Sequence, residues 1–166
     1  MPTFIRTAEG AFSLAEDAFT NVGDDEALPP GDVIISLTRF QTDGEGLLSE
    51  GRQVGVRVKS DEEVEALAYD LPRIAVVALE FPKYRDGRAF SSARVLRERL
   101  NFQGEVRAVG DVLRTLAGFM VRCGFDAFEP ADGSTPDDWQ RATLRFRHVY
   151  QRASDGRAPA YVERGE

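Results

Sequence analysis

Short apolar runs alternate with amphipathic segments along most of this 166-residue chain. The run 73–81, RIAVVALEF, is the clearest predicted strand, because a continuous apolar run of this kind is typical of a strand buried on both faces of a parallel sheet. Shorter runs and alternating patterns predict further strands at residues 32–37, 53–58, 105–110, 125–129 and 144–150.

Helices are predicted between the strands. Ser60 and Glu63 form a capping-box pattern that opens a helix over 60–71, and a second helix ends near Gly104. Residues 40–50 are weakly helical at best, because two glycines interrupt them. The apolar faces of the two helices are Val64, Leu67 and Leu71 in the first, and Ala93, Leu96 and Leu100 in the second.

Two more helices follow from their end signals. Asp111 is placed to cap a helix that Gly124 stops, and Thr135 and Pro136 take the N-cap and first positions of a short one. The apolar face of the helix after Asp111 consists of Val112, Leu116, Phe119, Met120 and Cys123.

Strand–helix alternation with short connections predicts an α/β fold with a mostly parallel sheet. Both an open doubly wound sheet and a partial (β/α) barrel fit the pattern, since six strands are too few for a complete barrel. Residues 32–150 are predicted to form a single α/β domain. Residues 1–31 are expected to be an irregular N-terminal arm, which Phe4, Ile5 and Phe12 either dock or pair as a hairpin, and residues 151–166 a loose C-terminal tail.

Composition narrows the class of protein. The formal charge of −7 disfavours binding to nucleic acid or to anionic membranes. A single cysteine excludes an intramolecular disulfide and suits the reducing cytoplasm, and a single histidine beside it disfavours a metal site of His and Cys ligands. No apolar stretch approaches the roughly 20 residues of a membrane span, and no secretory signal pattern opens the chain. The oligomeric state is left open.

Common cofactor and nucleotide fingerprints are missing. The chain has neither G-x-G-x-x-G nor G-x-x-x-x-G-K-[ST], and it lacks C-x-x-C and G-x-S-x-G as well. We therefore expect no bound cofactor, and any redox chemistry would need a partner that carries one.

Positive charge is concentrated after the clearest strand. Nine basic residues and four acidic ones lie between positions 83 and 122, although the whole chain is acidic. Ligands of parallel α/β folds bind beyond the carboxyl ends of strands, so this stretch is the candidate anion site. The predicted anion-binding residues are Lys83, Arg88, Ser91 and Arg107, and the predicted loop-shaping residues are Pro82, Asp86, Gly87 and Gly110.

Two carboxylates are candidates for acid–base work, Glu80 and Asp111, because each follows or ends a predicted strand. Each also has a structural alternative, a salt bridge for Glu80 and an N-cap for Asp111. Cys123, His148 and Trp139 are expected to pack in the core rather than act chemically.

Three motifs together resemble a bacterial family of unknown function. They are LEFPKYRDGRAFSSARVLRERL, GEVRAVGDVL and RCGFDAF, and the resemblance covers roughly residues 30–150. Genes of this family commonly lie beside those for assimilatory sulfite reductase and phosphoadenylylsulfate reductase, and its members are often labelled oxidoreductases. The motifs add Arg94, Arg97, Gly124, Phe125 and Asp126 to the candidate residues named above.

The resemblance implies a role in sulfate assimilation. We expect an accessory protein for sulfite reduction, with sulfite reductase or another sulfur-assimilation enzyme as partner. The alternatives are a small enzyme acting on an anionic metabolite and a purely structural or oligomeric module. Two departures from the family pattern, Ala89-Phe90 and Thr115-Leu116, leave this chain without side chains that other members carry there.

Overall fold

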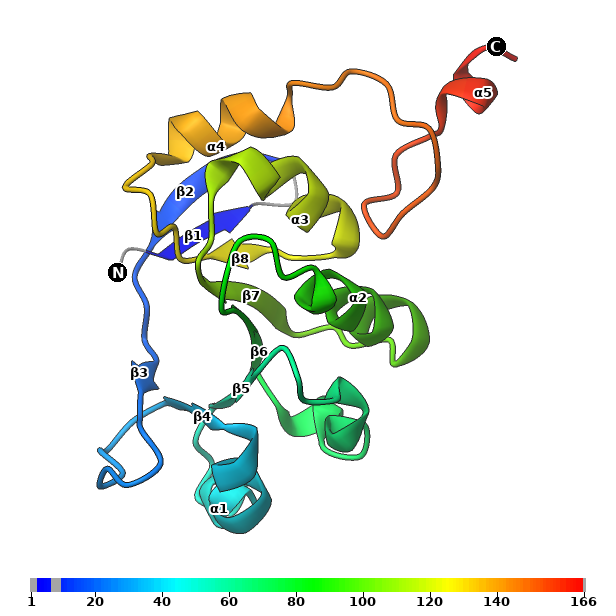
Figure 1. Ribbon diagram of the computed structural model, residues 1–166. Helices are drawn as coiled ribbons and strands as arrows, with labels where there is room; N and C mark the ends of the chain where they lie inside the picture. Colours follow the sequence, from blue (N-terminus) through cyan, green and yellow to red (C-terminus); the bar gives the residue numbers. More distant parts are fainter. Residues whose placement is uncertain (1–2, 7–9, 166) are drawn as a thin grey trace.

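The computed structural model describes residues 3–6 and 10–165, and shows one curled sheet with the helices gathered on one side of it (Figure 1). The strand order is β2-β1-β8-β7-β6-β5-β4-β3, and every ladder from β3 to β8 is parallel. The α/β fold with a mostly parallel sheet is therefore confirmed. A doubly wound sheet would carry helices on both faces, so the architecture is the partial barrel.

The elements have the following bounds. The strands are β1 Thr3–Arg6, β2 Phe12–Ala15, β3 Thr20–Asn21, β4 Val33–Ser36, β5 Val54–Val58, β6 Val76–Phe81, β7 Glu105–Gly110 and β8 Ala127–Phe128. The helices are α1 Leu37–Ser49, α2 Arg88–Arg94, α3 Ala117–Cys123, α4 Pro136–Thr143 and α5 Ala160–Glu163. Short helical turns are η1 Val64–Leu67, η2 Leu71–Arg73, η3 Val95–Arg99 and η4 Arg114–Leu116. No helix in these described ranges is apolar and long enough for a membrane span.

Strand alternation sends two sets of side chains to opposite faces of the sheet. Val56, Leu79 and Val106 belong to the large core under the helices, which also contains the buried Trp139 of α4. The other face, called here the helix-free face, carries a small apolar cluster of Ile34, Val76, Ala78 and Val109. Most of the apolar burial of the fold therefore lies on the helix side.

Residues 16–19, called here the strap, cross the helix-free face. They connect β2 to β3, which lie at opposite edges of the sheet, and Phe19 packs against the small apolar cluster of that face. The chain from Ala15 to Thr20 can reach at most roughly 17 Å. The edges of a flat eight-stranded sheet would be roughly 34 Å apart. The sheet must therefore curl for the strap to close across it.

Five of the predicted strands are confirmed, at β4, β5, β6, β7 and β8. The short helix α4 also begins as expected, with Thr135 as N-cap, Pro136 in the first turn and Asp138 completing a capping box. These elements carry strong local signals, either an uninterrupted apolar run or a matched pair of capping residues.

The N-terminal region is more regular than the expected irregular arm. Its residues form a β1–β2 hairpin that pairs with β8, followed by the short strand β3. The hairpin alternative therefore holds, and Phe12 packs against Phe128 and Trp139 with ring centroids 5.7 Å and 6.0 Å apart. The side chains of Phe4 and Ile5 lie outside the described residues.

Two predicted helix starts were wrong. Ser60 does not cap a helix, since its hydroxyl accepts a hydrogen bond from Arg88, and residues 60–71 contain only the turn η1 and the start of η2. Asp111 does not cap one either, because its carboxylate binds the N–H of Tyr84 and the next helical turn begins at Arg114. Long-range partners thus outcompete the local caps in both cases.

Three further expectations differ from the structure. Residues 40–50 lie in a regular helix, α1, in which Ser36 supplies the N-cap and the Phe40 ring fills the space beside Gly44. Residues 144–150 are not a strand, since they pair with no strand of the sheet and only Val149 makes an isolated bridge, to Pro159. The expected loose tail contains the short helix α5.

Gly110 should resist substitution because its backbone has φ +94° and a Cβ there would lie 2.4 Å from the carbonyl oxygen of Phe81. We expect Gly110→Ala to lower the free energy of unfolding by at least ~1–3 kcal/mol. Gly46→Ala is the matched control, since Gly46 lies in α1 with open space around it, and it should raise stability by about 1 kcal/mol. Urea unfolding of both variants checks the pair; equal stability of Gly110→Ala and the wild type would contradict it.

Candidate functional site

Residues 82–87 form the loop after β6, called here the strand-end loop. Hydrogen bonds to Asp111 hold it in place. Asp111, which follows β7, accepts a 2.7 Å hydrogen bond from the Tyr84 N–H, and its own N–H donates to the Phe81 carbonyl at 2.7 Å. Gly110 permits this because only a glycine fits so close to the Phe81 backbone. Gly110 and Asp111 therefore shape the loop, and one carboxylate oxygen of Asp111 is occupied by the Tyr84 N–H.

Arg88, the first residue of α2, is paired with a carboxylate of the strand-end loop. Its Nε and Nη2 donate to Asp86 at 3.0 and 2.6 Å, and Nη2 also donates to the Ser60 hydroxyl at 2.9 Å. Hydrogen bonds from the Arg88 side chain and backbone hold the pKa of Asp86 well below its usual value. The guanidinium expected to clamp an anion is thus already paired with a carboxylate.

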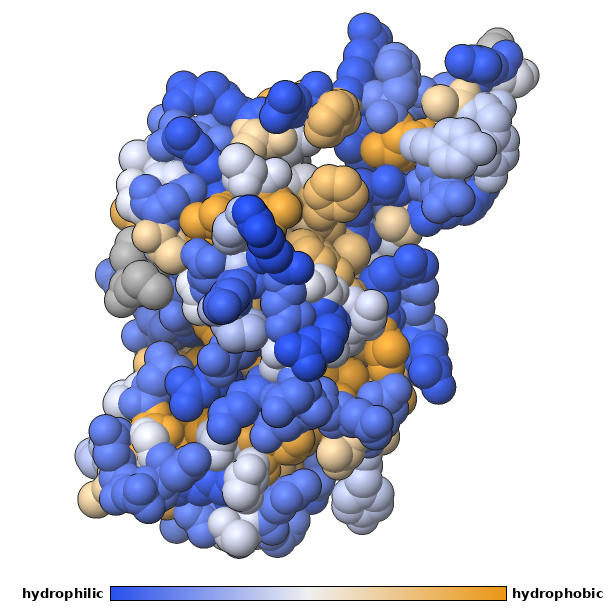
Figure 2. Space-filling model, in the orientation of Figure 1, coloured by the Kyte–Doolittle hydropathy of each residue, from blue (hydrophilic) through white to orange (hydrophobic). Residues whose placement is uncertain are grey.

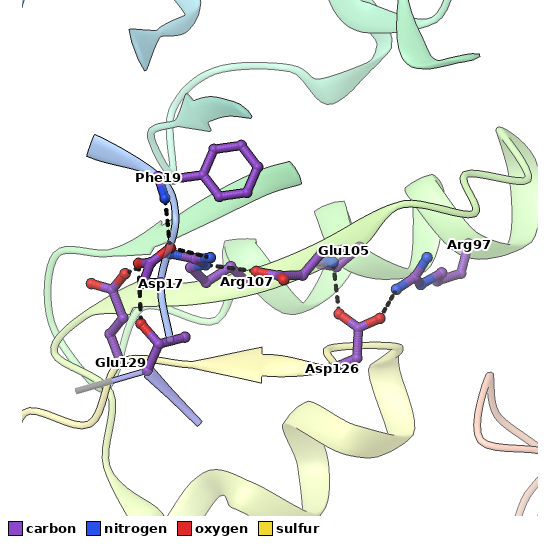
Figure 3. Close-up of polar contacts among 9 residues, drawn as sticks. Asp17, Phe19, Arg97, Glu105, Arg107, Asp126 and Glu129 are labelled. Atoms are coloured by element: carbon purple, nitrogen blue, oxygen red, sulfur yellow. Dashed lines mark hydrogen bonds and ion pairs between the residues drawn. The ribbon is translucent and has the colours of Figure 1, made fainter. Parts of the chain in front are cut away.

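Arg107 has a different place from the one expected. It lies on the helix-free face, almost fully buried, and binds three carboxylates (Figure 3). The distances are 2.6 Å from Nη1 to Asp17, 2.7 Å from Nε to Glu105 and 3.2 Å from Nη1 to Glu129. The guanidinium carbon of Arg107, Cζ, lies over the Phe19 ring, 5.9 Å from the ring centroid. Arg107 therefore anchors the strap to the sheet.

Contacts within this cluster shift the pKa values of Arg107 and Asp17 so that both stay charged at neutral pH. Burial opposes the charged form of Arg107, yet hydrogen bonds to Asp17 and the charge of Glu105 raise its pKa above the usual value. Burial would likewise raise the pKa of Asp17, but hydrogen bonds from Arg107 and from the Phe19 N–H outweigh it and hold that pKa below 3.8. Since three carboxylates surround one guanidinium, the cluster carries two net negative charges.

The predicted anion-binding residues do not converge. Arg107 lies on the helix-free face, whereas Arg88 and Ser91 belong to α2, which packs on the opposite face through Ala89 and Ala93. Lys83 is exposed in the strand-end loop, and its side chain has no hydrogen bond or ion pair with any described residue. No contact among these residues forms a shared site in the part of the chain that the structure describes.

The family-motif residues Arg97, Gly124 and Asp126 form a structural clamp. Arg97 donates to the carbonyls of Phe102, Gly104 and Gly124, and its Nη2 binds Asp126 at 2.9 Å. Asp126 also accepts the Val106 N–H at 2.8 Å (Figure 3). Burial nevertheless raises the pKa of Asp126 to about 6. This clamp joins the end of η3 to the start of β8.

A large cavity lies outside the region that the sequence singled out. It is bounded by α3, α4 and residues 144–157, called here the basic groove, and has a volume of about 1150 Å³. Phe119, Leu144 and Phe146 line it with 66, 68 and 65% of their surfaces exposed. Figure 2 shows hydrophobic side chains gathered between the upper part of the molecule and its C-terminal segment.

The basic groove also carries an excess of positive charge. Six arginines and two aspartates line it, although the whole chain has a charge of −7. Arg122 pairs with Asp155, and Arg114 and Arg141 share Asp138, while Arg147 pairs with no described carboxylate. The sequence patterns do not predict this groove, because they place Phe119 on a buried helix face and Phe146 in a strand. The density of arginines from 141 to 157 is the sequence signal that could have found it.

Comparison with known protein families identifies one match. The sequence model of a bacterial protein family of unknown function, DUF934, matches residues 55–161, more than half of the chain. The chain belongs to this family. The expected family resemblance is thus confirmed. The matched residues include the strand-end loop, the Arg97 clamp and most of the basic groove. No curated protein and no solved structure matches the chain.

Metal ligation gains no support from the geometry. Within residues 3–6 and 10–165, no group of three or more His, Cys, Asp or Glu side chains is arranged to hold a metal ion. Cys123 is half-buried, and burial raises the pKa of its thiol, which disfavours the reactive thiolate.

Arg107→Met tests the anchor of the strap. The variant leaves three carboxylates without their counter-ion, so we expect the free energy of unfolding at neutral pH to fall by ~3–5 kcal/mol. Because the folded pKa of Asp17 is lowered, its stabilisation exists above pH 3.8 and disappears as the pH falls through the folded value. The difference in free energy of unfolding between wild type and variant should therefore become smaller in acid. Urea unfolding at a series of pH values measures it. Arg152→Met, at an exposed arginine without a described partner, is the control; a difference independent of pH would contradict the prediction.

Proposed function

We propose that the protein is an accessory protein of assimilatory sulfite reduction, which binds an acidic segment of sulfite reductase or of another enzyme of that pathway in the basic groove. The observation that carries the proposal is the combination of exposed aromatic side chains with surplus arginines in one cavity. Exposed apolar patches of this kind mark interaction sites, and acidic segments are the ligands that arginine clusters recognise.

The dimensions of the groove favour a polypeptide over a small molecule. Its volume of about 1150 Å³ exceeds the usual range for small-molecule pockets, roughly 300–1,000 Å³. Aromatic residues and arginine are also the residue types that contribute most to protein–protein binding. Phe119 and Phe146 would supply the apolar anchors, and Arg147 the charge that selects an acidic partner.

The pathway in this proposal comes from the family. Members of the family resembled by the three motifs are encoded beside sulfite reductase genes, and the chain belongs to a family of unknown function that matches the same region. A stand-alone enzyme receives less support, because one candidate catalytic carboxylate and one candidate anion-binding arginine already have partners within the protein. Asp111 is committed to the Tyr84 N–H, and Arg88 to Asp86.

Phe119→Asp combined with Arg147→Glu tests the proposal by placing negative charge in the groove. We expect purified sulfite reductase to bind the wild-type protein, and the double variant to bind at least roughly 30-fold more weakly, as for loss of an interface hot spot. Added salt should also weaken the wild-type complex. Isothermal titration calorimetry measures both effects.

Tyr69→Asp is the matched control, because Tyr69 is an exposed aromatic residue that lies outside the groove, between η1 and η2. It should bind sulfite reductase like the wild type. Co-purification from cells extends the test to other enzymes of the pathway. Absence of any complex with them, together with unchanged sulfite reduction in a deletion strain, would contradict the proposed function.

A further inference from the structure

Two charged side chains on the helix-free face are neighbours across the central strands. Arg57 of β5 alternates with the core residues Val56 and Val58, and Glu80 of β6 alternates with Leu79 and Phe81, so both point away from the helices. Arg57 pairs in register with Ala78, which places Glu80 two residues further along the adjacent strand. The two Cα atoms are therefore roughly 8 Å apart.

Both side chains are half-buried, yet neither has a hydrogen bond or ion pair with any residue that the structure describes. This sets Arg57 apart from the other half-buried or buried arginines of the described ranges. Each of those donates to a carboxylate or carbonyl: Arg39, Arg52, Arg97, Arg107, Arg122 and Arg157.

Glu80 is equally unusual among the half-buried carboxylates. Each of the others in the described ranges accepts at least one hydrogen bond: Asp32, Asp43, Glu62, Asp70, Asp86, Glu105, Asp111, Asp126, Glu129, Asp138 and Asp155. The two side chains thus lie on one face and have opposite charge, and their charged atoms reach solvent without a partner among the described residues. Charged groups that the sheet holds in position, and that no protein group neutralises, are available to a ligand of complementary charge.

The surroundings of the pair define the preferred charge of a ligand. Ala78 is the small residue between Arg57 and Arg107 in register, and Val109 lies opposite Glu80. The Arg107 cluster beyond Ala78 carries two net negative charges. A bare anion at Arg57 would be repelled by this cluster and by Glu80, whereas a ligand that also carries a cationic group would be attracted to both.

We propose that Arg57 and Glu80 bind a small zwitterion, with a carboxylate or sulfonate and an ammonium group on one molecule, of which a free amino acid is the simplest case. The Arg57 guanidinium would donate two hydrogen bonds to the acidic group, and Glu80 would accept from the ammonium. The site lies toward the carboxyl ends of parallel strands on the inner face of a partial barrel, where ligands of such folds bind. It is independent of the basic groove.

Ligand binding is tested by thermal unfolding and calorimetry of the full chain with a panel of free amino acids and taurine. At least one member should raise the unfolding temperature, and Arg57→Met and Glu80→Gln should each weaken its binding roughly tenfold or more. The groove variant Phe119→Asp, and Arg152→Met at an exposed arginine, should bind it like the wild type.

A second measurement uses the same variants without ligand. Because neither side chain has a partner in the protein, Arg57→Met and Glu80→Gln should leave the stability of the free protein unchanged or increase it. Three results would overturn the proposal: no stabilisation by any zwitterion, stabilisation by inorganic phosphate or sulfate alone, or marked destabilisation of the free protein by both variants.

Discussion

The shape of this protein depends on a short strap held by a buried guanidinium. Residues 16–19 must connect opposite edges of the sheet, and their length allows this only if the sheet curls into a half-barrel. Arg107 then fixes the strap by binding Asp17 while it also binds Glu105 and Glu129 on the sheet. An ion cluster of this kind is a weak source of net stability but a strong selector of one arrangement, since any displacement leaves buried charge unpaired.

The parallel core of the fold could be predicted from the sequence because its signals are local. The apolar run at 73–81 and the alternation of Val54, Val56 and Val58 allow only one interpretation of those strands. The signals failed where a distant residue decided the outcome: Arg88 takes the hydroxyl of Ser60, and the Tyr84 N–H takes the carboxylate of Asp111. The β1–β2 hairpin likewise depends on β8, whose position no N-terminal pattern reveals.

The candidate site was only partly predictable for a related reason. Position after a strand correctly marked Glu80 as a polar residue near the carboxyl end of β6, but charge along the sequence did not reveal which charges were already neutralised. Arg88 and Arg107 are paired with carboxylates, whereas Arg57, which stands within an alternating valine strand, has no partner among the described residues. Contacts in the folded protein, rather than the density of charge along the sequence, therefore decide which charged side chains remain able to bind a ligand.

The register between Phe4 and Phe128 also constrains how the chain reaches its final form. Strand β1 precedes β8 by more than 120 residues in the sequence, so β1 has only β2 as a neighbour until β8 has been synthesised. Closure of the sheet is thus a late, non-local event, and loop-closure entropy makes such events slow. Until then the edges of β1 and β7 that β8 will cover are exposed, which is when a chaperone would be of most use to the chain.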